Sequence, residues 1–322
     1  MKRSNAFLLL LAFALILVGG IAEAQPYPQR PVQVIIPNVP GSIQDINGRA
    51  LSDEVGRIIG AQLVPVNKPG ASMTLGTDLL ARSKKDGYTI GYLGGTAIVY
   101  ARILNPETVP YDPDRDLAPL GMHLFNVLGV NVQAESPWKT FAELVDYAKQ
   151  NPGKLRVGTI GVGSVDHLNL EIIQSITGAQ FTHVPFKGGE STASALLGGH
   201  VEVTFDAFSK CIPFVESGKV RILLTSRKMA GYPQIPVASE LGYKEKLLTG
   251  WFAFYGPSGM PEEATKVLIP AIEKAVKHPE LKARMEKMGF DVEYKTPAEV
   301  ERQAKEDYET TSKLAEKLGL RK

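Results

Sequence analysis

The sequence contains a single cysteine, Cys211, among its 322 residues. One cysteine excludes a disulfide within the chain. Because Cys211 precedes Ile212, Pro213 and Phe214, we expect it to be a small buried residue rather than a reactive thiol. The chain also lacks an excess of either charge, since 36 Lys and Arg residues stand against 34 Asp and Glu residues, for a net charge of +2. This balance argues against nucleic acid or a membrane surface as the partner.

Signatures of several enzyme classes are absent from the sequence. It has no G-x-S-x-G, H-E-x-x-H, G-x-x-x-x-G-K-[ST] or C-x-x-C motif. The glycines at 158, 161 and 163 follow a strand-like run, but their order is not the G-x-G-x-x-G of a dinucleotide loop. The histidines are scattered, without the spacing of metal ligands: His123, His167, His183, His200 and His278. We therefore expect a protein that is not an enzyme, with no catalytic residue, metal or cofactor.

A long apolar run is found at the N-terminus, where residues 6–18 carry no charge. Lys2 and Arg3 precede this run, and the small-x-small sequence Ala22-Glu23-Ala24 follows it. This order is typical of a secretory signal peptide, and the run is short for a membrane span of about 20 residues. We predict a signal peptide over residues 1–24, a periplasmic location and, with no cysteine near the cleavage site, no lipid anchor. The remaining 298 residues are long for one core and suit two domains.

Strand-like and helical segments alternate along the chain. The expected strands are residues 32–36, 62–66, 88–93, 126–132, 155–159, 181–185, 201–205, 220–225 and 251–255. The expected helices are residues 42–60, 75–84, 140–151, 164–176, 191–197, 212–217, 262–277, 280–288 and 297–318. Alternation of this kind predicts an α/β fold with mainly parallel sheets.

Two glycine-bearing loops each connect a predicted strand to a predicted helix. They are Pro40-Gly41-Ser42-Ile43-Gln44-Asp45 and Gly161-Val162-Gly163-Ser164-Val165-Asp166-His167. The start of a helix offers unpaired backbone N–H groups and a partial positive charge. Two such starts that face each other across a cleft would bind an anion, so we expect a small carboxylate as the ligand. The alternative is that the loops have a purely structural role, because any α/β protein needs tight turns between its strands and helices.

Side chains in the two loops allow more than one role. Ser42 and Gln44 can donate hydrogen bonds to a ligand, whereas Asp45 would repel an anion and is expected to cap its own helix. Ser164 can cap its helix or reach a ligand. His167, at about the third helical position, can touch a ligand or serve only the structure.

Several short motifs, each weak alone, occur in an order and spacing that together are specific. The chain resembles the extracytoplasmic solute receptors of tripartite tricarboxylate transporters, often called the Bug family, over nearly its whole length after the signal peptide. The motifs are Tyr27-Pro28-Gln29-Arg30-Pro31, Ile36-Pro37-Asn38-Val39-Pro40-Gly41, Asn67-Lys68-Pro69-Gly70-Ala71, Asp86-Gly87-Tyr88-Thr89, Pro110-Tyr111-Asp112-Pro113, Asn151-Pro152-Gly153-Lys154-Leu155, His183-Val184-Pro185-Phe186-Lys187-Gly188 and Phe205-Asp206.

The resemblance implies a two-domain periplasmic binding protein of a type II-like fold with a hinged cleft between the domains. Domain 1 would hold residues 25–125 and 250–322, and domain 2 would hold residues 126–249. The resemblance also implies that the two loops grip one carboxylate, partly through waters, and that the receptor passes its ligand to membrane permease subunits. The ligand-binding residues expected on this basis are Val39, Gly41, Ser42, Ile43, Gln44, Gly94, Gly95, Thr96, Gly161, Val162, Gly163, Ser164, Val165, His167, Phe186, Asp206 and Phe208.

This sequence departs from the family pattern in all three loops. The first loop usually carries a run of glycines, replaced here by Ser42, Ile43 and Gln44. The second usually offers consecutive Ser or Thr residues, and the loop at Gly94 usually carries hydroxyls and a histidine. Here these places are taken by Val165, Asp166, Ala97, Ile98 and Val99. Apolar surface gains roughly 25 cal/mol per Å² on burial, so we expect a monocarboxylate or dicarboxylate with an aliphatic or aromatic body.

The sequence leaves open the far end of the ligand site and two alternative functions. Phe208 and Lys210 are expected to form walls at the far end of the ligand. A sensor that presents its acid to a membrane signalling protein would share fold and ligand with a transport receptor. A periplasmic hydrolase would need a nucleophile and base, for which Ser164 and His167 are the candidates. We expect a monomer that binds no nucleic acid.

Overall fold

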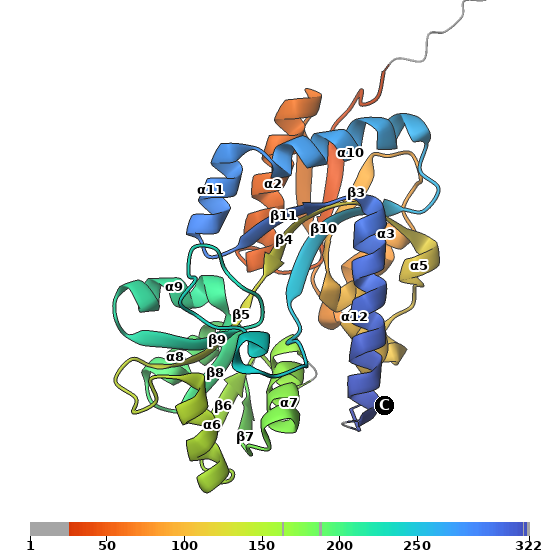
Figure 1. The fold of residues 1–322 in the computed structure, drawn as a ribbon. Helices are drawn as coiled ribbons and strands as arrows, with labels where there is room; N and C mark the ends of the chain where they lie inside the picture. Colours follow the sequence, from red (N-terminus) through yellow and green to blue (C-terminus); the bar gives the residue numbers. More distant parts are fainter. Residues whose placement is uncertain (1–25, 163, 187–188, 318, 321–322) are drawn as a thin grey trace, which may run out of the picture.

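The structure, a computed structural model, describes residues 26–162, 164–186, 189–317 and 319–320. Two β-sheets, each with helices packed on it, form two α/β domains that lie one above the other in Figure 1. No helix in this described part of the chain is both long enough and apolar enough to cross a membrane. The predicted signal peptide falls outside the described residues.

The upper sheet in Figure 1 has six strands in the order β11-β4-β10-β3-β1-β2. These strands are β1 (Val32–Ile36), β2 (Leu63–Asn67), β3 (Thr89–Gly94), β4 (Leu117–Asn126), β10 (Gly250–Pro257) and β11 (Asp291–Lys295). The helices and helical turns of this part are α2 (Ile43–Ile59), η1 (Ala71–Met73), α3 (Thr74–Ala81), η2 (Thr96–Tyr100), α4 (Ala101–Leu104), η3 (Pro106–Thr108), α5 (Pro113–Asp116), α10 (Glu262–Val276), α11 (Pro279–Lys287) and α12 (Pro297–Lys317).

The lower sheet has five strands in the order β7-β6-β8-β5-β9. These strands are β5 (Leu128–Gln133), β6 (Arg156–Thr159), β7 (Thr182–Pro185), β8 (Val203–Ala207) and β9 (Val220–Thr225). Its helices are α6 (Phe141–Gln150), α7 (Val165–Thr177), α8 (Gly189–Leu197) and α9 (Phe208–Glu216), and the turn η4 (Ala238–Leu241) follows β9. Cys211 lies in α9 and is buried, as predicted.

The α/β prediction is confirmed, but the sheets are mixed rather than mainly parallel. Strand β1 pairs in parallel with β2 and β3, and β6 pairs in parallel with β7 and β8. Strands β4, β5 and β10 make only antiparallel pairs. One reason is that β4 leads out of the upper sheet toward the lower one and its neighbour β10 leads back into it, so the two strands run in opposite directions.

Two strands of the upper sheet were not expected from the sequence. β4 contains Pro119 and Gly121, and β11 has the polar sequence Asp-Val-Glu-Tyr-Lys. Proline and glycine disfavour strands, and so do the Asp, Glu and Lys residues that make up most of β11, so these segments are recognised as strands from their pairing with distant partners. β4 pairs with β10 on one side and with β11 on the other.

The chain passes between the two sheets at two adjacent places. β4 ends at Asn126 and β5 begins at Leu128, and the return from the lower sheet enters β10 at Gly250. Asn126 and Gly250 are register partners in the upper sheet. The hydroxyl oxygen of Ser226 accepts hydrogen bonds from Leu128 N and from Thr249 Oγ1, both at 3.0 Å. The two passages are therefore joined to each other.

Candidate functional site

The first glycine loop ends in a capped helix start. Ser42 is the N-cap of α2, and its Oγ accepts a hydrogen bond from Asp45 N at 3.2 Å. Gly41 has φ +77°, a left-handed conformation that favours glycine. Asp45 Oδ2 accepts a hydrogen bond from Gly41 N at 2.9 Å, so the prediction that Asp45 serves its own helix start is confirmed.

Asp45 also ties this loop to β2. Its Oδ1 accepts hydrogen bonds from Arg49 Nε at 2.9 Å and from Asn67 Nδ2 at 2.8 Å. Burial alone would raise the pKa of Asp45, but the hydrogen bonds from Arg49, Gly41 and Asn67 outweigh it and lower the pKa below 3.8. Asp45 is therefore an ionised anchor that fixes the loop, and its charge is already satisfied.

Gln44 has a different role from the one expected. Its side chain is buried, and Nε2 donates to Tyr92 O of β3 at 2.7 Å, while Oε1 accepts a long hydrogen bond from Asn38 Nδ2. Gln44 lies on the face of α2 that covers the sheet, where a buried amide needs partners in the protein. Its amide is therefore directed into the protein and not toward a ligand.

Backbone donors remain at the start of α2. Gly41 N donates to Asp45, Ser42 N to Val39 O, and Asp45 N to Ser42 Oγ. No described residue accepts a hydrogen bond from Ile43 N or Gln44 N. These two N–H groups are the ones that the first loop can offer to an anion.

The second loop has the same construction. Ser164 is the N-cap of α7; its Oγ accepts from His167 N at 3.2 Å and donates to Gly161 O at 2.7 Å. No described residue accepts a hydrogen bond from Val165 N, and the N–H of Asp166 faces its own carboxylate. Val165 N is therefore the open donor here, whereas the expected contact of Gly163 lies outside the described residues.

His167 is held in a stack beneath the second loop. Its ring lies 4.3 Å from that of His183, at an interplanar angle of 14°. His183 Nε2 is 2.7 Å from Thr159 Oγ1, which also accepts a hydrogen bond from Gly161 N. Burial lowers the pKa of His167, and burial together with the charge of His167 lowers that of His183 to about 4. The pair is neutral at pH 7 and supports the turn at Gly161.

Two carboxyl groups are buried behind the second loop. Asp206, at the end of β8, accepts hydrogen bonds from Ala207 N and Thr192 Oγ1. Burial, and next the charge of Asp206, raise the pKa of Asp166 to about 8, and Lys210 opposes this shift. Asp166 is therefore mostly protonated at neutral pH, and an uncharged carboxyl group does not repel an anion at this loop.

Phe208, which was expected to form a wall together with Lys210, and Phe186, which was expected to contact the ligand, do not line an open surface in this structure. Phe208 is fully buried, with its ring 4.9 Å from that of Tyr232 and close to Gly289. Its position at the start of α9, where that helix packs against the turn before β11, accounts for this burial. Phe186 is half-buried against Gly158. Val39 and Val162, in contrast, are 53% and 72% exposed, and they place apolar side chains at the two glycine loops.

The segment Gly94-Gly95-Thr96 packs closely on β10. A Cβ atom on Gly94 would lie 3.0 Å from the Phe252 ring, and one on Gly95 would lie 3.1 Å from the Trp251 indole. Trp251 Nε1 donates to Asp307 Oδ2 of α12 at 2.8 Å. Sequence reasoning missed Trp251 and Asp307, because 56 residues separate them and neither belongs to a local motif.

The structure thus brings the expected residues into separate groups. Asp45 and Gly41 are joined within the first loop, Gln44 is directed to Tyr92, and His167, Gly161 and the buried acids lie at the second loop. No hydrogen bond or ion pair connects the described residues of one loop with those of the other. What the loops share is a capped helix start with open backbone donors.

Comparison with known proteins identifies the family. A family model described as the tripartite tricarboxylate transporter family receptor matches residues 48–320. The chain belongs to this receptor family. It is 32% identical over 317 residues to the "UPF0065 protein in gbd 5'region" of Cupriavidus necator, covering 97% of this chain and 94% of that one.

Solved structures agree with this assignment. The periplasmic binding protein BugD superposes with a TM-score of 0.78 at 25% identity, over 92% of this chain and 99% of its own. An R. palustris protein solved with adipate has a TM-score of 0.81 at 24% identity, over 91% and 98% of the two chains. The predicted family and the two-domain periplasmic-binding-protein fold are confirmed.

Proposed function

We propose that this receptor binds a small organic carboxylate in the periplasm and delivers it to the membrane permease of a tripartite tricarboxylate transporter. The observation that carries the proposal is the set of open backbone donors at the starts of α2 and α7, namely Ile43 N, Gln44 N and Val165 N. Backbone N–H groups at a helix start bind carboxylates without a charged side chain.

The ligand we propose is a monocarboxylate or dicarboxylate with an apolar body. Val39 and Val162 expose apolar side chains at the two loops, whereas Ala97, Ile98 and Val99, which follow the third loop, are buried in the protein core. A tricarboxylate would require further donors, which these residues cannot supply. The adipate found with the R. palustris structure is itself an aliphatic dicarboxylate and supports this class.

The geometry supports a receptor better than a hydrolase. Ser164 Oγ donates its proton to Gly161 O, and the contact with His167 is made by the backbone N–H of that residue. The His167 ring stacks on His183, which supports a structural role for this histidine over that of a base for Ser164. A sensory role would use the same site, and uptake measured with and without the permease separates it from transport.

We further propose that residues 1–24 are a cleaved signal peptide, that the protein is monomeric, and that domain 2 comprises residues 126–249. The register pair Asn126 and Gly250 supports this division, because the segment between them leaves the upper sheet and returns to it at one place.

Substitutions that remove single N–H groups test the site. Ile43 and Val165 are the first helical residues of α2 and α7, a position where proline is tolerated. The residues before them, Ser42 (φ −67°, ψ 160°) and Ser164 (φ −75°, ψ 162°), already have the extended conformation that proline requires. Ile43→Pro and Val165→Pro therefore delete a donor while keeping the helix.

The experiment measures thermal shifts of the protein with a panel of aliphatic and aromatic mono- and dicarboxylates at millimolar concentration. Each proline variant should bind the responding acid roughly tenfold more weakly or worse, since a hydrogen bond to a charged group contributes about 1.5–3 kcal/mol. Ile43→Ala and Val165→Ala, which shorten the same side chains but retain the N–H, are the controls. The proposal fails if no acid raises the melting temperature and none is retained on purification, or if the proline variants bind like the alanine variants.

A further inference from the structure

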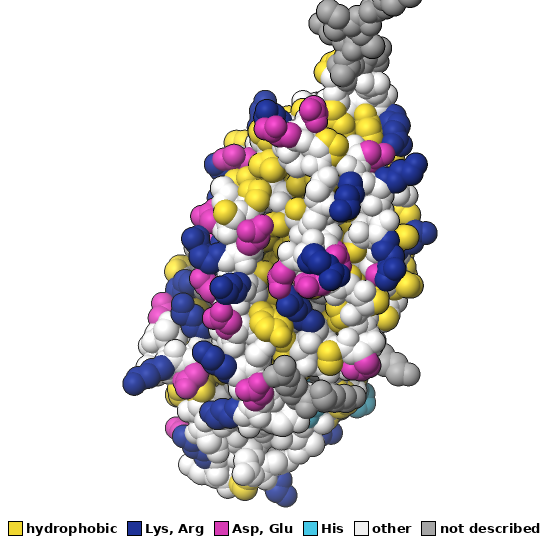
Figure 2. Space-filling view, turned by 90° about the vertical axis from the view of Figure 1, so that its right-hand side faces the viewer, with side chains coloured by type: hydrophobic (Ala, Val, Ile, Leu, Met, Phe, Trp, Pro, Cys, Tyr) yellow, Lys and Arg dark blue, Asp and Glu magenta, His cyan; other side chains and the backbone are white. Residues whose placement is uncertain are grey.

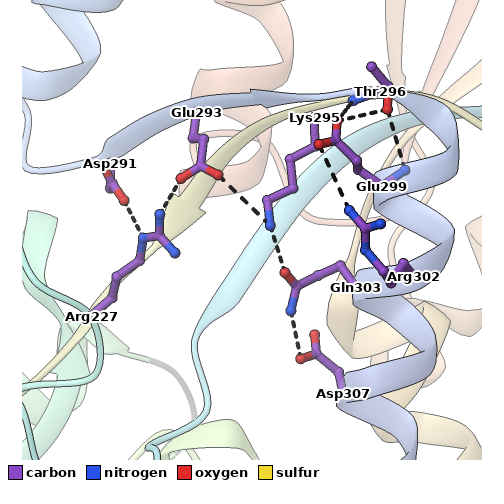
Figure 3. Close-up of polar contacts among 9 residues, drawn as sticks. All are labelled: Arg227, Asp291, Glu293, Lys295, Thr296, Glu299, Arg302, Gln303 and Asp307. Atoms are coloured by element: carbon purple, nitrogen blue, oxygen red, sulfur yellow. Dashed lines mark hydrogen bonds and ion pairs between the residues drawn. The ribbon is translucent and has the colours of Figure 1, made fainter. Parts of the chain in front are cut away.

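We propose that Arg227 and the two carboxylates Asp291 and Glu293 form an interdomain latch that sets how far the two domains open. Arg227 follows β9 of the lower sheet, whereas Asp291 and Glu293 belong to β11 at the edge of the upper sheet. Figure 3 shows the guanidinium reaching up to both carboxylates. We call these three residues the Arg227 latch.

The contacts of the latch are specific in geometry. Arg227 Nε pairs with Asp291 Oδ2, and Nη2 pairs with Glu293 Oε2. The guanidinium carbon also lies 4.0 Å from the centre of the Phe125 ring of β4. A planar fork that holds two carboxylates and stacks on an aromatic ring uses properties that lysine lacks. One cation of the lower domain is thus held at three points of the upper domain.

The position of the latch connects it with opening. Asp291 is the register partner of Phe125, the residue before Asn126, where the chain leaves the upper sheet. Arg227 follows Ser226, whose hydroxyl joins the two passages between the sheets. Because the latch spans from one domain to the other beside these passages, rotation of the domains about them must change its distances.

Glu293 is also held from within the upper domain. Lys295 Nζ lies 3.8 Å from Glu293 Oε1 and donates to Gln303 Oε1 at 2.9 Å. Gln303 Nε2 donates to Asp307 Oδ1 (Figure 3). Asp307 also accepts a hydrogen bond from the Trp251 indole, which packs against Gly95. Glu293 is therefore connected, through the side chains of Lys295, Gln303 and Asp307, to Trp251, against which the Gly94–Thr96 segment packs.

A second close contact between the domains lies next to the latch. Gly289, in the turn between α11 and β11, has φ +84°, and a Cβ there would come within 2.9 Å of Ser209 Cα in α9. Phe208 and Ile212 of α9 also approach this glycine. The turn that precedes β11 is thus packed against α9 of the lower domain. The ion pairs of the latch lie next to this packed contact between the domains.

The test measures the distance between the domains in the protein without ligand. Spin labels on Lys149→Cys in α6 and Lys274→Cys in α10, with buried Cys211 replaced by Ala, report this distance. Arg227→Gln should raise the ratio of the open to the latched population roughly fivefold, the size of effect expected for a partly exposed ion pair. Raising NaCl from 0.05 to 0.5 M should produce the same shift in the parent protein and little in Arg227→Gln, because salt screens such pairs.

Arg156→Gln is the matched control. Arg156 pairs with Glu202 at similar exposure, but both residues lie in the lower domain. Its distance distribution should equal that of the parent, and circular dichroism checks folding of each variant. If Arg227→Gln does not fold, Arg227→Lys, which keeps the charge without the fork, should give an intermediate shift. The latch is refuted if the folded Arg227 variant has the parental distribution at both salt concentrations. Because no ligand is used, that result would leave the receptor proposal untouched.

Discussion

Asn169 and Leu248 exchange two hydrogen bonds. Asn169 Nδ2 donates to Leu248 O at 2.9 Å, and Leu248 N donates to Asn169 Oδ1 at 2.7 Å. Asn169 lies in α7, four residues after the open donor of Val165, and Leu248 lies two residues before β10. The helix that carries the second loop is therefore tied to the chain that returns to the upper sheet.

Replacing Asn169 with leucine should destabilise the protein considerably. The change keeps the size of the side chain but leaves the N–H and the C=O of Leu248, both buried, without partners. Each such group costs about 1–3 kcal/mol, so we expect a loss of about 2–5 kcal/mol in urea unfolding. Asn151→Ala, which removes an exposed hydrogen bond at the end of α6, should cost less than 1 kcal/mol. Equal losses in the two variants would contradict the importance of the pair.

Adding one methyl group at Gly95 should disturb the third loop. A Cβ there would lie 3.1 Å from the Trp251 indole, which is fully buried and cannot easily move. We expect Gly95→Ala to lower the free energy of unfolding by about 1–3 kcal/mol and to change the tryptophan fluorescence of the folded protein. Gly231→Ala is the control, because nothing lies within 4 Å of its Cβ position. An unchanged stability and spectrum in Gly95→Ala would show that this contact is unimportant.

The buried acid Asp166 predicts a dependence of stability on pH. Burial raises its pKa from 3.8 to about 8 in the folded state, so folding is progressively disfavoured as the pH rises from 4 to 8. The side chain of Asp166→Asn cannot ionise. The melting temperature of this variant minus that of the parent should therefore increase as the pH is raised from 5 to 8. Asp53→Asn, on the exposed side of α2, is the control for loss of a carboxylate. A difference that stays constant over this range would contradict the proposed protonation of Asp166.

Asp45 predicts the opposite dependence. Its pKa lies below 3.8 in the folded state, so ionisation of Asp45 stabilises the protein above pH 4, and that stability is lost as the pH falls through the lowered pKa. Asp45→Asn should be less stable than the parent at pH 6, and the gap in melting temperature should narrow toward pH 3. A gap that widens on acidification would show that the contacts with Arg49 and Gly41 do not favour the charged form.

Local sequence signals predicted the elements that carry the candidate site. Apolar runs marked β1 and β6, and the Gly-Ser pairs that follow them predicted the capped starts of α2 and α7, since a cap depends on residues next to each other. The strands β4 and β11 were missed, because their sequences become extended only through partners far along the chain.

Side-chain directions within the site were less predictable. Gln44 is directed to Tyr92, 48 residues away, and Phe208 packs close to Gly289. Neither contact can be predicted from the neighbouring residues in the sequence. The free backbone N–H groups of Ile43 and Val165, in contrast, follow from helix geometry alone. The backbone part of the site was therefore accessible from sequence, and the packing around it was not.

The pairing of Asn126 with Gly250 has a consequence for how this protein could have been assembled. Everything between these partners is one uninterrupted stretch of chain that starts and finishes at the same spot on the upper sheet. Such a stretch can be exchanged for the equivalent stretch of a relative with only two cut points, and the recipient sheet keeps all six of its strands. The exchanged stretch would include the second glycine loop, the buried acids Asp166 and Asp206, and Arg227. The first loop and the β11 carboxylates lie outside it and would remain those of the recipient. Recombination at this spot would therefore join one half of a binding site to a new other half.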